Sequence, residues 1–211
     1  MSDLTIEQIQ SALAQKLPGR SAQHKMAPQP LPDMLSRWDK PTDCRNAAVL
    51  LLLYPHITRN SKQEWHILLT RRSEYPGVHS GQISFPGGRH EADETFQATA
   101  LRETHEEVGV LPDTVTIIGQ LSYLYTPPSN FCIYPYVGYV DQRPDFQTDM
   151  VEVAELIEPP LNLMQDPTIR RHEIRTFKDG VPRNIPYFDV YGHKVWGATA
   201  MMLSEFLTII N

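Results

Sequence analysis

Hydrophobic positions along the chain predict a series of strands separated by polar turns. The longest apolar run, residues 47–54, is typical of a strand buried on both faces, and we expect that strand to cover residues 45–54. Polar or proline-containing turns follow at residues 55–64, 126–130 and 178–180. The remaining predicted strands are residues 65–71, 82–85, 115–125, 131–140, 171–177 and 187–191.

Apolar residues at helical spacing predict a helix near each end of the chain and one in the middle. Ser2 or Asp3 can cap the first helix, which we expect to run to Leu17. A polar, proline-dotted stretch at residues 19–43 then predicts an extended connector. Residues 197–210 predict a closing helix.

The middle helix, over about residues 95–108, has a start signal, a stop signal and an apolar stripe. Asp93 or Thr95 can cap its N-terminus, and Gly109 is placed to end it. The stripe predicts that this helix packs on a sheet while its glutamates face a cleft. The stripe consists of Ala98, Leu101, Thr104 and Val108.

The order of these elements favours an α/β fold with a mixed sheet between helices. We expect two regions: an N-terminal helical and extended segment, residues 1–44, and a single domain, residues 45–211. A length of 211 residues suffices for one such domain with an extension.

Composition argues for a soluble protein that does not hold nucleic acid by broad electrostatics. The formal net charge is −6 and hydrophobic residues make up 41% of the chain. No basic stretch is present, and the longest apolar run is too short for a membrane span. One polyphosphate pocket remains compatible with this charge, because a bound metal inverts the local sign.

The N-terminus and the cysteines predict a cytoplasmic location. The first residues are acidic and lack the basic start and apolar core of a signal peptide. Cys44 and Cys132 are too few for a disulfide framework, so we expect buried or incidental thiols in a reducing compartment.

Three carboxylates are crowded into five residues of the middle helix. Glu103, Glu106 and Glu107 stand at i, i+3 and i+4 and would share one face. Like charges at this spacing repel, and a divalent cation would offset the repulsion. A solvated acidic face is the alternative.

The wider spacing favours the metal. The segment from Gly88 to Val110 resembles the Nudix box, which fixes a set of glycine, arginine and glutamate positions; Thr104, where the box has an aliphatic residue, is the one departure. The matching positions are Gly88, Glu94, Arg102, Glu103, Glu106, Glu107 and Gly109. The resemblance implies an α/β/α sandwich and hydrolysis of a nucleoside diphosphate linked to another group.

The resemblance also implies a role for each box residue. Mg²⁺ or Mn²⁺ would be bound by Glu103, Glu106 and Glu107 with a backbone carbonyl at Gly87 or Gly88, and hard oxygen ligands suit these ions. Glu94 would assist the metal site. Arg102 would orient the glutamates by ion pairing.

Two positions in the sequence are candidates for the general base. Some family members use a glutamate of the box, here Glu106, and others one well downstream. Glu152 is the downstream candidate, and a surface acidic turn is the alternative for its segment.

The residues just upstream of the box indicate a substrate. Segments 68–73 and 81–88 resemble the additional motif of the coenzyme A diphosphatase branch, with every spacing kept and Gly77 in place of one arginine. Residues 195–200 are similar to the closing segment of that branch. The residues expected to contact substrate are Arg71, Arg72, Ser73, His79 and Gly87, with solvent exposure the alternative for His79.

Coenzyme A would then be cleaved to 4′-phosphopantetheine and adenosine 3′,5′-bisphosphate. The alternatives are another nucleoside diphosphate derivative (NADH, ADP-ribose or a nucleotide sugar), a catalytically inactive binding module, or an enzyme directed at nucleic acid, which the acidic balance disfavours. The expected partner is a small nucleotide-derived molecule, with no nucleic acid or membrane, and a homodimer is compatible with the family.

Aromatic residues flank the predicted turn at residues 126–130. They predict core packing, with adenine stacking or a dimer surface as alternatives. They are Tyr123, Tyr125, Phe131, Tyr134 and Tyr136.

Overall fold

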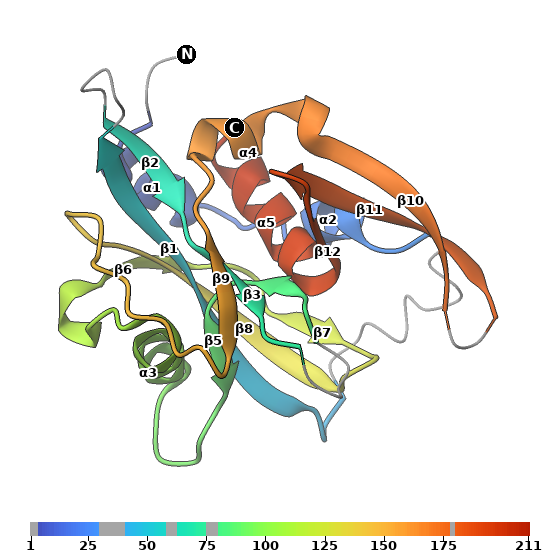
Figure 1. Ribbon diagram of the computed structural model, residues 1–211, viewed down its shortest axis with the longest axis horizontal. Coiled ribbons are helices and arrows are strands. Elements are labelled where there is room, and N and C mark those ends of the chain that lie inside the picture. The colour runs from blue at the N-terminus through green and yellow to red at the C-terminus, as the bar shows by residue number, and fades with distance from the viewer. Residues whose placement is uncertain (1–3, 30–40, 58–62, 75–79, 178–179) are drawn as a thin grey trace.

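A mixed β-sheet lies between α3 on one side and α1 and α5 on the other (Figure 1). The computed structural model describes residues 4–29, 41–57, 63–74, 80–177 and 180–211. Within them the predicted class, an α/β fold with a mixed sheet between helices, is confirmed.

The helical elements are short apart from α3 and α5. No helix in the described ranges has the length and apolar character needed to cross a bilayer. The helices are α1 (Ile6–Leu13), α2 (Arg20–Gln23), α3 (Phe96–Val108), α4 (Leu161–Gln165) and α5 (Gly197–Ile209), with 3₁₀ turns η1 (His24–Met26), η3 (Pro112–Thr114) and η4 (Pro167–Ile169).

The strands form one larger sheet and two smaller ones. The larger sheet has the order β2-β1-β8-β6, with β5 also paired to β1 and β7 to β8. The smaller sheets are β4-β3-β9 and β10-β11-β12. The strands are β1 (Arg45–Ile57), β2 (Gln63–Ile67), β3 (Leu69–Arg72), β4 (Ile83–Ser84), β5 (Gly87–Arg89), β6 (Thr116–Gln120), β7 (Leu124–Thr126), β8 (Phe131–Tyr139), β9 (Val153–Ile157), β10 (Arg170–Thr176), β11 (Pro182–Val190) and β12 (His193–Trp196).

Strand β1 separates the two cores of the molecule. Its side chains alternate between faces, as the period of a strand requires. Val49, Leu51 and Leu53 join the core that contains α1 and α5. Leu50 and Leu52 join the core beneath α3. Burial on both faces explains why the sequence of β1 is continuously apolar instead of alternating.

Most predicted strands are present with shifted ends. The predicted strand at 65–71 is divided into β2 and β3 at Leu68, whose N–H donates to Leu52 O of β1 over 3.1 Å. The predicted strand at 115–125 is likewise divided into β6 and β7. Gly87 and Gly88 follow the predicted strand at 82–85 and form part of β5, which pairs with β1.

The N-terminal segment differs from its prediction in three details. Helix α1 is capped by Thr5, which forms a capping box with Gln8, and it ends at Leu13. Leu17 precedes Pro18, which disfavours helical backbone at that residue. The connector expectation is also wrong for residues 20–26, which form α2 and η1.

A buried polar network ties α2 to α5. The Glu205 carboxylate is fully buried and accepts hydrogen bonds from Gln23 Nε2 at 2.8 Å and Gly19 N at 3.1 Å. These donors offset the cost of burying the carboxylate. The N-terminal residues described here therefore pack on the core of the domain.

The C-terminal part contains the predicted strand pair and three unpredicted elements. Strands β10 and β11 pair antiparallel, and α5 closes the chain, as expected. Strand β12 extends this sheet. Strand β9, which pairs with β3, and the following α4 were not predicted. Residues 150–152, just before β9, form a turn, which was the alternative for the segment of Glu152.

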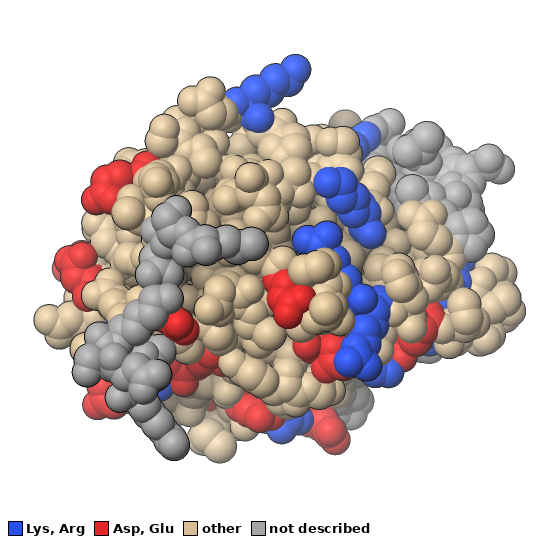
Figure 2. Space-filling view, turned by 90° about the horizontal axis from the view of Figure 1, so that it is seen from above, with Lys and Arg blue, Asp and Glu red and all other residues tan. Residues whose placement is uncertain are grey.

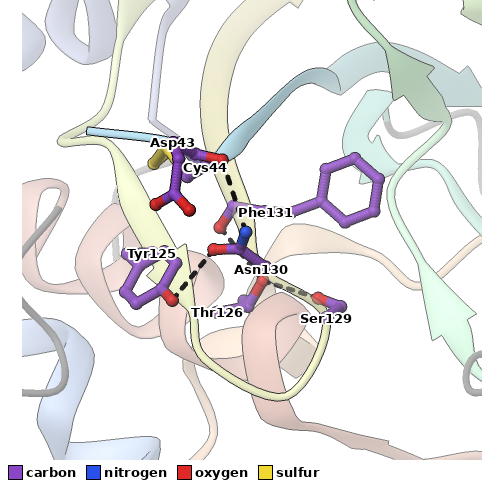
Figure 3. Close-up of a disulfide and its surroundings, with 8 residues drawn as sticks. Asp43, Cys44, Tyr125, Thr126, Ser129, Asn130 and Phe131 are labelled. Atoms are coloured by element: carbon purple, nitrogen blue, oxygen red, sulfur yellow. Dashed lines mark hydrogen bonds between the residues drawn. A yellow bond between two sulfur atoms is a disulfide. The ribbon is translucent and has the colours of Figure 1, made fainter. Parts of the chain in front are cut away.

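Cys44 and Cys132 form a disulfide (Figure 3), so the expectation of free thiols is wrong. The register of parallel strands explains the pairing. Asn46 of β1 lies opposite Cys132 of β8, which brings Cys44 within 5.8 Å of Cys132 between Cα atoms. The reducing compartment inferred from free thiols loses that support.

The same end of the molecule is held by polar contacts around residues 126–130. Asn130 accepts a hydrogen bond from Tyr125 Oη at 3.0 Å, and its amide donates to Asp43 O at 3.4 Å (Figure 3). The guanidinium of Arg45 lies 4.2 Å from the Phe131 ring centre.

Candidate functional site

Two glycines bring the backbone of β5 close to β1 and α3. Gly87 has φ of +146°, and a Cβ there would lie 2.6 Å from Val49 Cα. A Cβ on Gly88 would lie 2.7 Å from Glu103 Oε1. The Glu103 carboxylate therefore packs directly against the β5 backbone, which is possible only because residue 88 has no side chain.

Helix α3 begins and ends as its sequence predicts. Thr95 caps the N-terminus by accepting a hydrogen bond from Ala98 N at 3.1 Å. Gly109 ends the helix with φ of +76°, and its N–H donates to His105 O. These two ends fix which turns of the helix carry the glutamates.

The face of α3 that packs on the sheet is shifted from the predicted stripe. Thr104 and Val108 are buried as expected, whereas Ala98 is exposed and Ala100 takes its place. Thr104 is accommodated because its hydroxyl donates to Ala100 O at 2.6 Å.

The three box glutamates have unequal exposure. The exposed side-chain fractions are 15% for Glu103, 56% for Glu106 and 3% for Glu107. Burial raises the pKa of Glu103, and it raises the pKa of Glu107 to about 7. Exposure therefore increases from Glu107 in the core, through Glu103, to Glu106 at the surface.

Arg102 holds three carboxylates at once. Its guanidinium lies 2.8 Å from Glu94, 3.0 Å from Glu103 and 3.0 Å from Glu106, and it also donates to Arg89 O at 3.2 Å. The planar guanidinium, with five N–H donors, suits this geometry. Its hydrogen bond to Glu94 raises the pKa of Arg102.

Glu94 lies at the start of α3 and is tied to Arg102. The two hydrogen bonds from Arg102 lower the pKa of Glu94 to about 2. Thr99 Oγ1 also donates to Glu94 at 2.7 Å. Glu94 thereby positions Arg102, which in turn contacts Glu103 and Glu106.

Arg72 joins the upstream motif to the box. Its guanidinium lies 3.4 Å from Glu107 Oε1 and 3.8 Å from Glu152 Oε2. Gly87 N donates to the other oxygen of Glu107 at 3.3 Å. Ser73 N donates to Glu152 O at 2.9 Å, so β3 and the segment before β9 present Arg72 and Glu152 side by side.

Arg71 does not contact the box glutamates. It pairs with Glu155 of β9 at 2.9 Å, and His193 of β12 lies 3.4 Å from the same carboxylate. Neighbouring side chains of a strand project to opposite faces, which separates Arg71 from Arg72. The sequence-predicted residues His79 and Gly77 lie outside the described residues.

A model of the NUDIX domain matches residues 54–177, more than half of the chain. The chain belongs to the Nudix family. Nudix hydrolase 3 of Caenorhabditis elegans is 31% identical over 182 residues, covering 79% of this chain and 74% of that protein. The uncharacterized Nudix hydrolase NudL of Yersinia pestis (strain Pestoides F) is 35% identical over 161 residues, covering 75% of this chain and 76% of that protein.

Among solved structures, the MutT protein from Methanosarcina mazei Go1 is similar with a TM-score of 0.48 and 20% identity. The likeness covers 78% of this chain and 92% of that chain.

Membership identifies the protein as a Nudix hydrolase, a class that acts on nucleoside diphosphate derivatives and generally uses divalent metal ions. The segment that resembles the Nudix box, residues 88–110, lies within the matched residues. The placement of Glu103 against β5 and of Arg102 among three carboxylates is the geometry that this box produces here.

The donor set fits a hard divalent cation. Glu103, Glu106 and Glu107 offer only oxygen, on successive turns beside the β5 backbone. The carboxylate of buried Glu107 lies 3.3 Å from Gly87 N and 3.4 Å from Arg72 Nη1, and a cation would compensate its burial more closely than these long contacts do. Among the described residues no three acidic, histidine or cysteine side chains converge on one point, and the box glutamates are instead paired with Arg102 and Arg72.

Sequence reasoning missed the charged residues that β10 and β12 bring near β3. Arg175 and Lys194 are 100 or more residues away from Arg71 in the chain, yet all three border one pocket. The basic character of residues 170–175 was a usable signal, but nothing in the sequence placed that strand beside the upstream motif.

The aromatic residues near 126–130 divide between core and surface. Tyr134 stacks on Phe96 of α3 with ring centres 3.9 Å apart, which supports the core interpretation for that residue. Tyr123, in contrast, is exposed over 40% of its surface.

Proposed function

We propose that this protein hydrolyses the diphosphate of coenzyme A or its derivatives with the help of Mg²⁺ or Mn²⁺. The supporting observation is the position of Arg72. This residue belongs to the motif that resembles the coenzyme A diphosphatase branch, and its guanidinium lies between Glu107 of the Nudix box and Glu152. The upstream motif and the box therefore border the same site.

In this proposal Glu103, Glu106 and Glu107 hold the metal. The bound ion would neutralise phosphate charge and lower the pKa of a bound water. Arg102 positions Glu103 and Glu106 through its ion pairs, and Glu94 fixes Arg102. A backbone carbonyl at Gly87 or Gly88 would complete the set.

The reaction breaks one P–O bond of the diphosphate. Water adds its oxygen to one phosphorus, its proton passes to Glu152 or to a box glutamate such as Glu106, and the bridging oxygen leaves with the other phosphate. Arg72 lies where it can bind a phosphate oxygen, with Ser73 and Gly87 beside it. The products are 4′-phosphopantetheine and adenosine 3′,5′-bisphosphate.

A second candidate is another nucleoside diphosphate derivative, such as NADH, ADP-ribose or a nucleotide sugar. It is favoured by one observation: Gly77 stands where the motif of the coenzyme A branch has an arginine. The metal chemistry would be the same, and only the groups outside the diphosphate would differ.

Product analysis with a substrate panel tests the proposal. Purified protein is incubated with Mg²⁺ or Mn²⁺ and, separately, with coenzyme A, acetyl-coenzyme A, NADH, ADP-ribose, UDP-glucose and a dinucleoside polyphosphate. We expect adenosine 3′,5′-bisphosphate, formed preferentially from the two coenzyme A compounds. Cleavage of another compound alone would favour the second candidate, and no cleavage at all would contradict both.

A further inference from the structure

A pocket of about 470 Å³ lies between the small sheet that contains β3 and the C-terminal sheet. Its volume is that of a typical site for a small molecule. Residues 80–83, which lead into β4, form one wall, and β10 and β12 form the other. The side chains that matter for its chemistry are Arg71, Arg175, His193, Lys194 and Trp196.

The lining of this basic pocket has a single sign of charge. Three of its residues are permanent cations and one is an imidazole, and no Asp or Glu is among the described residues that line it. In the space-filling view of Figure 2, Lys and Arg side chains gather mainly on the right half of the face, with Asp and Glu side chains beside some of them. Within the described chain three cations, Arg71, Arg175 and Lys194, are paired with only two carboxylates, Glu155 and Glu173, so the cluster keeps a net positive charge that favours an anion.

Carboxylates just outside the lining hold these cations in place. Glu173 pairs with both Arg175 and Lys194, and Glu155 pairs with Arg71. The Arg175 guanidinium also lies 4.4 Å from the Trp196 ring centre. Side chains fixed in this way lose less conformational entropy when they bind a ligand.

The pocket adjoins the candidate active site through β3. Arg71 lines the pocket, and the next residue, Arg72, contacts Glu107 of the Nudix box. The backbone of Arg72 donates to the O of Gln82, another pocket residue, at 3.0 Å. Because Arg71 and Arg72 project to opposite faces of β3, a substrate whose diphosphate lies at Arg72 would pass around the end of this strand to place another group in the pocket.

We propose that this basic pocket binds a phosphate monoester that the substrate carries in addition to its diphosphate. This inference rests on the proposed function, in which that group is the 3′-phosphate of coenzyme A. The motif arginine is replaced by Gly77, only three residues before Ser80, which lines the pocket. Arg175 and Lys194 supply positive charge from a different part of the chain.

Comparing coenzyme A with dephospho-coenzyme A tests the pocket, because the two differ only in this phosphate. For the wild type we expect kcat/KM to be at least about tenfold higher with coenzyme A, the value of one charge-assisted hydrogen bond. Lys194→Met and Arg175→Gln should each remove most of that preference by raising KM for coenzyme A. Their kcat/KM for dephospho-coenzyme A should change less than about twofold.

Arg171→Gln is the matched control. Arg171 lies on the same strand as Arg175 and pairs with a carboxylate, Asp189 at 3.2 Å, but it does not line the pocket. This variant should keep the wild-type preference. Lys194 is 48% exposed, so its substitution is the safer of the two for folding, and thermal unfolding of each variant checks this.

A binding measurement separates this inference from the proposed function. Calorimetry compares adenosine 3′,5′-bisphosphate with AMP for the wild type, Lys194→Met and Arg171→Gln, without any turnover. Preference for the bisphosphate that Lys194→Met loses supports the pocket even if no coenzyme A is cleaved. Three results would overturn the inference. They are equal affinity of the wild type for adenosine 3′,5′-bisphosphate and AMP, equal wild-type kcat/KM for coenzyme A and dephospho-coenzyme A, and an equal fall in kcat/KM for both coenzymes in Lys194→Met.

Discussion

The Nudix box and the basic pocket are neighbours in space but are encoded in different ways. The box occupies 23 consecutive residues, and β5, the turn after it and α3 place every glutamate. The pocket is assembled from β3, the residues before β4, β10 and β12, which span residues 71 to 196. In the box, a local pattern determines the chemistry. In the pocket, chemistry depends on which strands the tertiary fold places together.

The largest effect should come from the box. Glu106→Gln removes a charged oxygen ligand while keeping the size of the side chain, and we expect turnover to fall by roughly three orders of magnitude or more. Chelation by EDTA should abolish activity, and added Mg²⁺ or Mn²⁺ should restore it. The assay is product release from the best substrate of the panel.

Asp113→Asn is the control for Glu106→Gln, because Asp113 is an exposed carboxylate in η3, outside the box. It should keep wild-type activity. Near wild-type turnover by Glu106→Gln, with an unchanged metal requirement, would show that the metal is bound elsewhere.

A smaller effect should come from the backbone that supports the box. In Gly88→Ala the new methyl group would lie 2.7 Å from Glu103 Oε1, so the carboxylate must move. We expect kcat to fall roughly 10- to 100-fold, because misplacing a catalytic group costs about that much. The metal concentration for half-maximal activity should also rise.

Gly180→Ala separates this local effect from a general loss of stability. A Cβ on Gly180 would meet no atom within 4 Å, but its φ of +76° makes the substitution strained. It should cost about 1 kcal/mol of unfolding free energy and leave kcat unchanged. Similar activity losses in both variants would mean that Glu103 does not depend on Gly88.

The contrast explains how much was predictable. The ends of α3, the buried strand β1 and the position of the box follow from local signals: Thr95, Gly109, an apolar run and the spacing of the glutamates. The disulfide and the pocket do not, because Cys44 meets Cys132 only through the register of β1 with β8. Strand β9 was missed because acidic residues surround it: Asp149 and Glu152 precede it and Glu155 lies inside it. Such a sequence is also typical of a surface turn.

A substitution at position 77 links the two regions. If Arg175 and Lys194 replace the motif arginine, Gly77→Arg should raise kcat/KM for coenzyme A less than about threefold in the wild type. In the Lys194→Met background it should recover most of the lost activity, a gain of roughly tenfold. A large gain in the wild type and none in the Lys194→Met background would show that the pocket does not fill this role.

The smallest effect should come from a carboxylate that belongs to neither region. Burial acts to raise the pKa of Glu158, but hydrogen bonds from Arg143 and Tyr54 outweigh it and hold that pKa below its usual value. A depressed pKa contributes stability above the pKa of the unfolded state, near 4.3, and this contribution is lost as the pH falls through the folded pKa. Glu158→Gln should therefore lower the unfolding free energy by roughly 1 kcal/mol at pH 7 and by less at pH 3.

Chemical denaturation at the two pH values measures this difference, and kcat for coenzyme A at pH 7 should not change. A loss of activity in Glu158→Gln would mean that paired carboxylates outside the box also support the reaction, and the division between the box and its framework would fail.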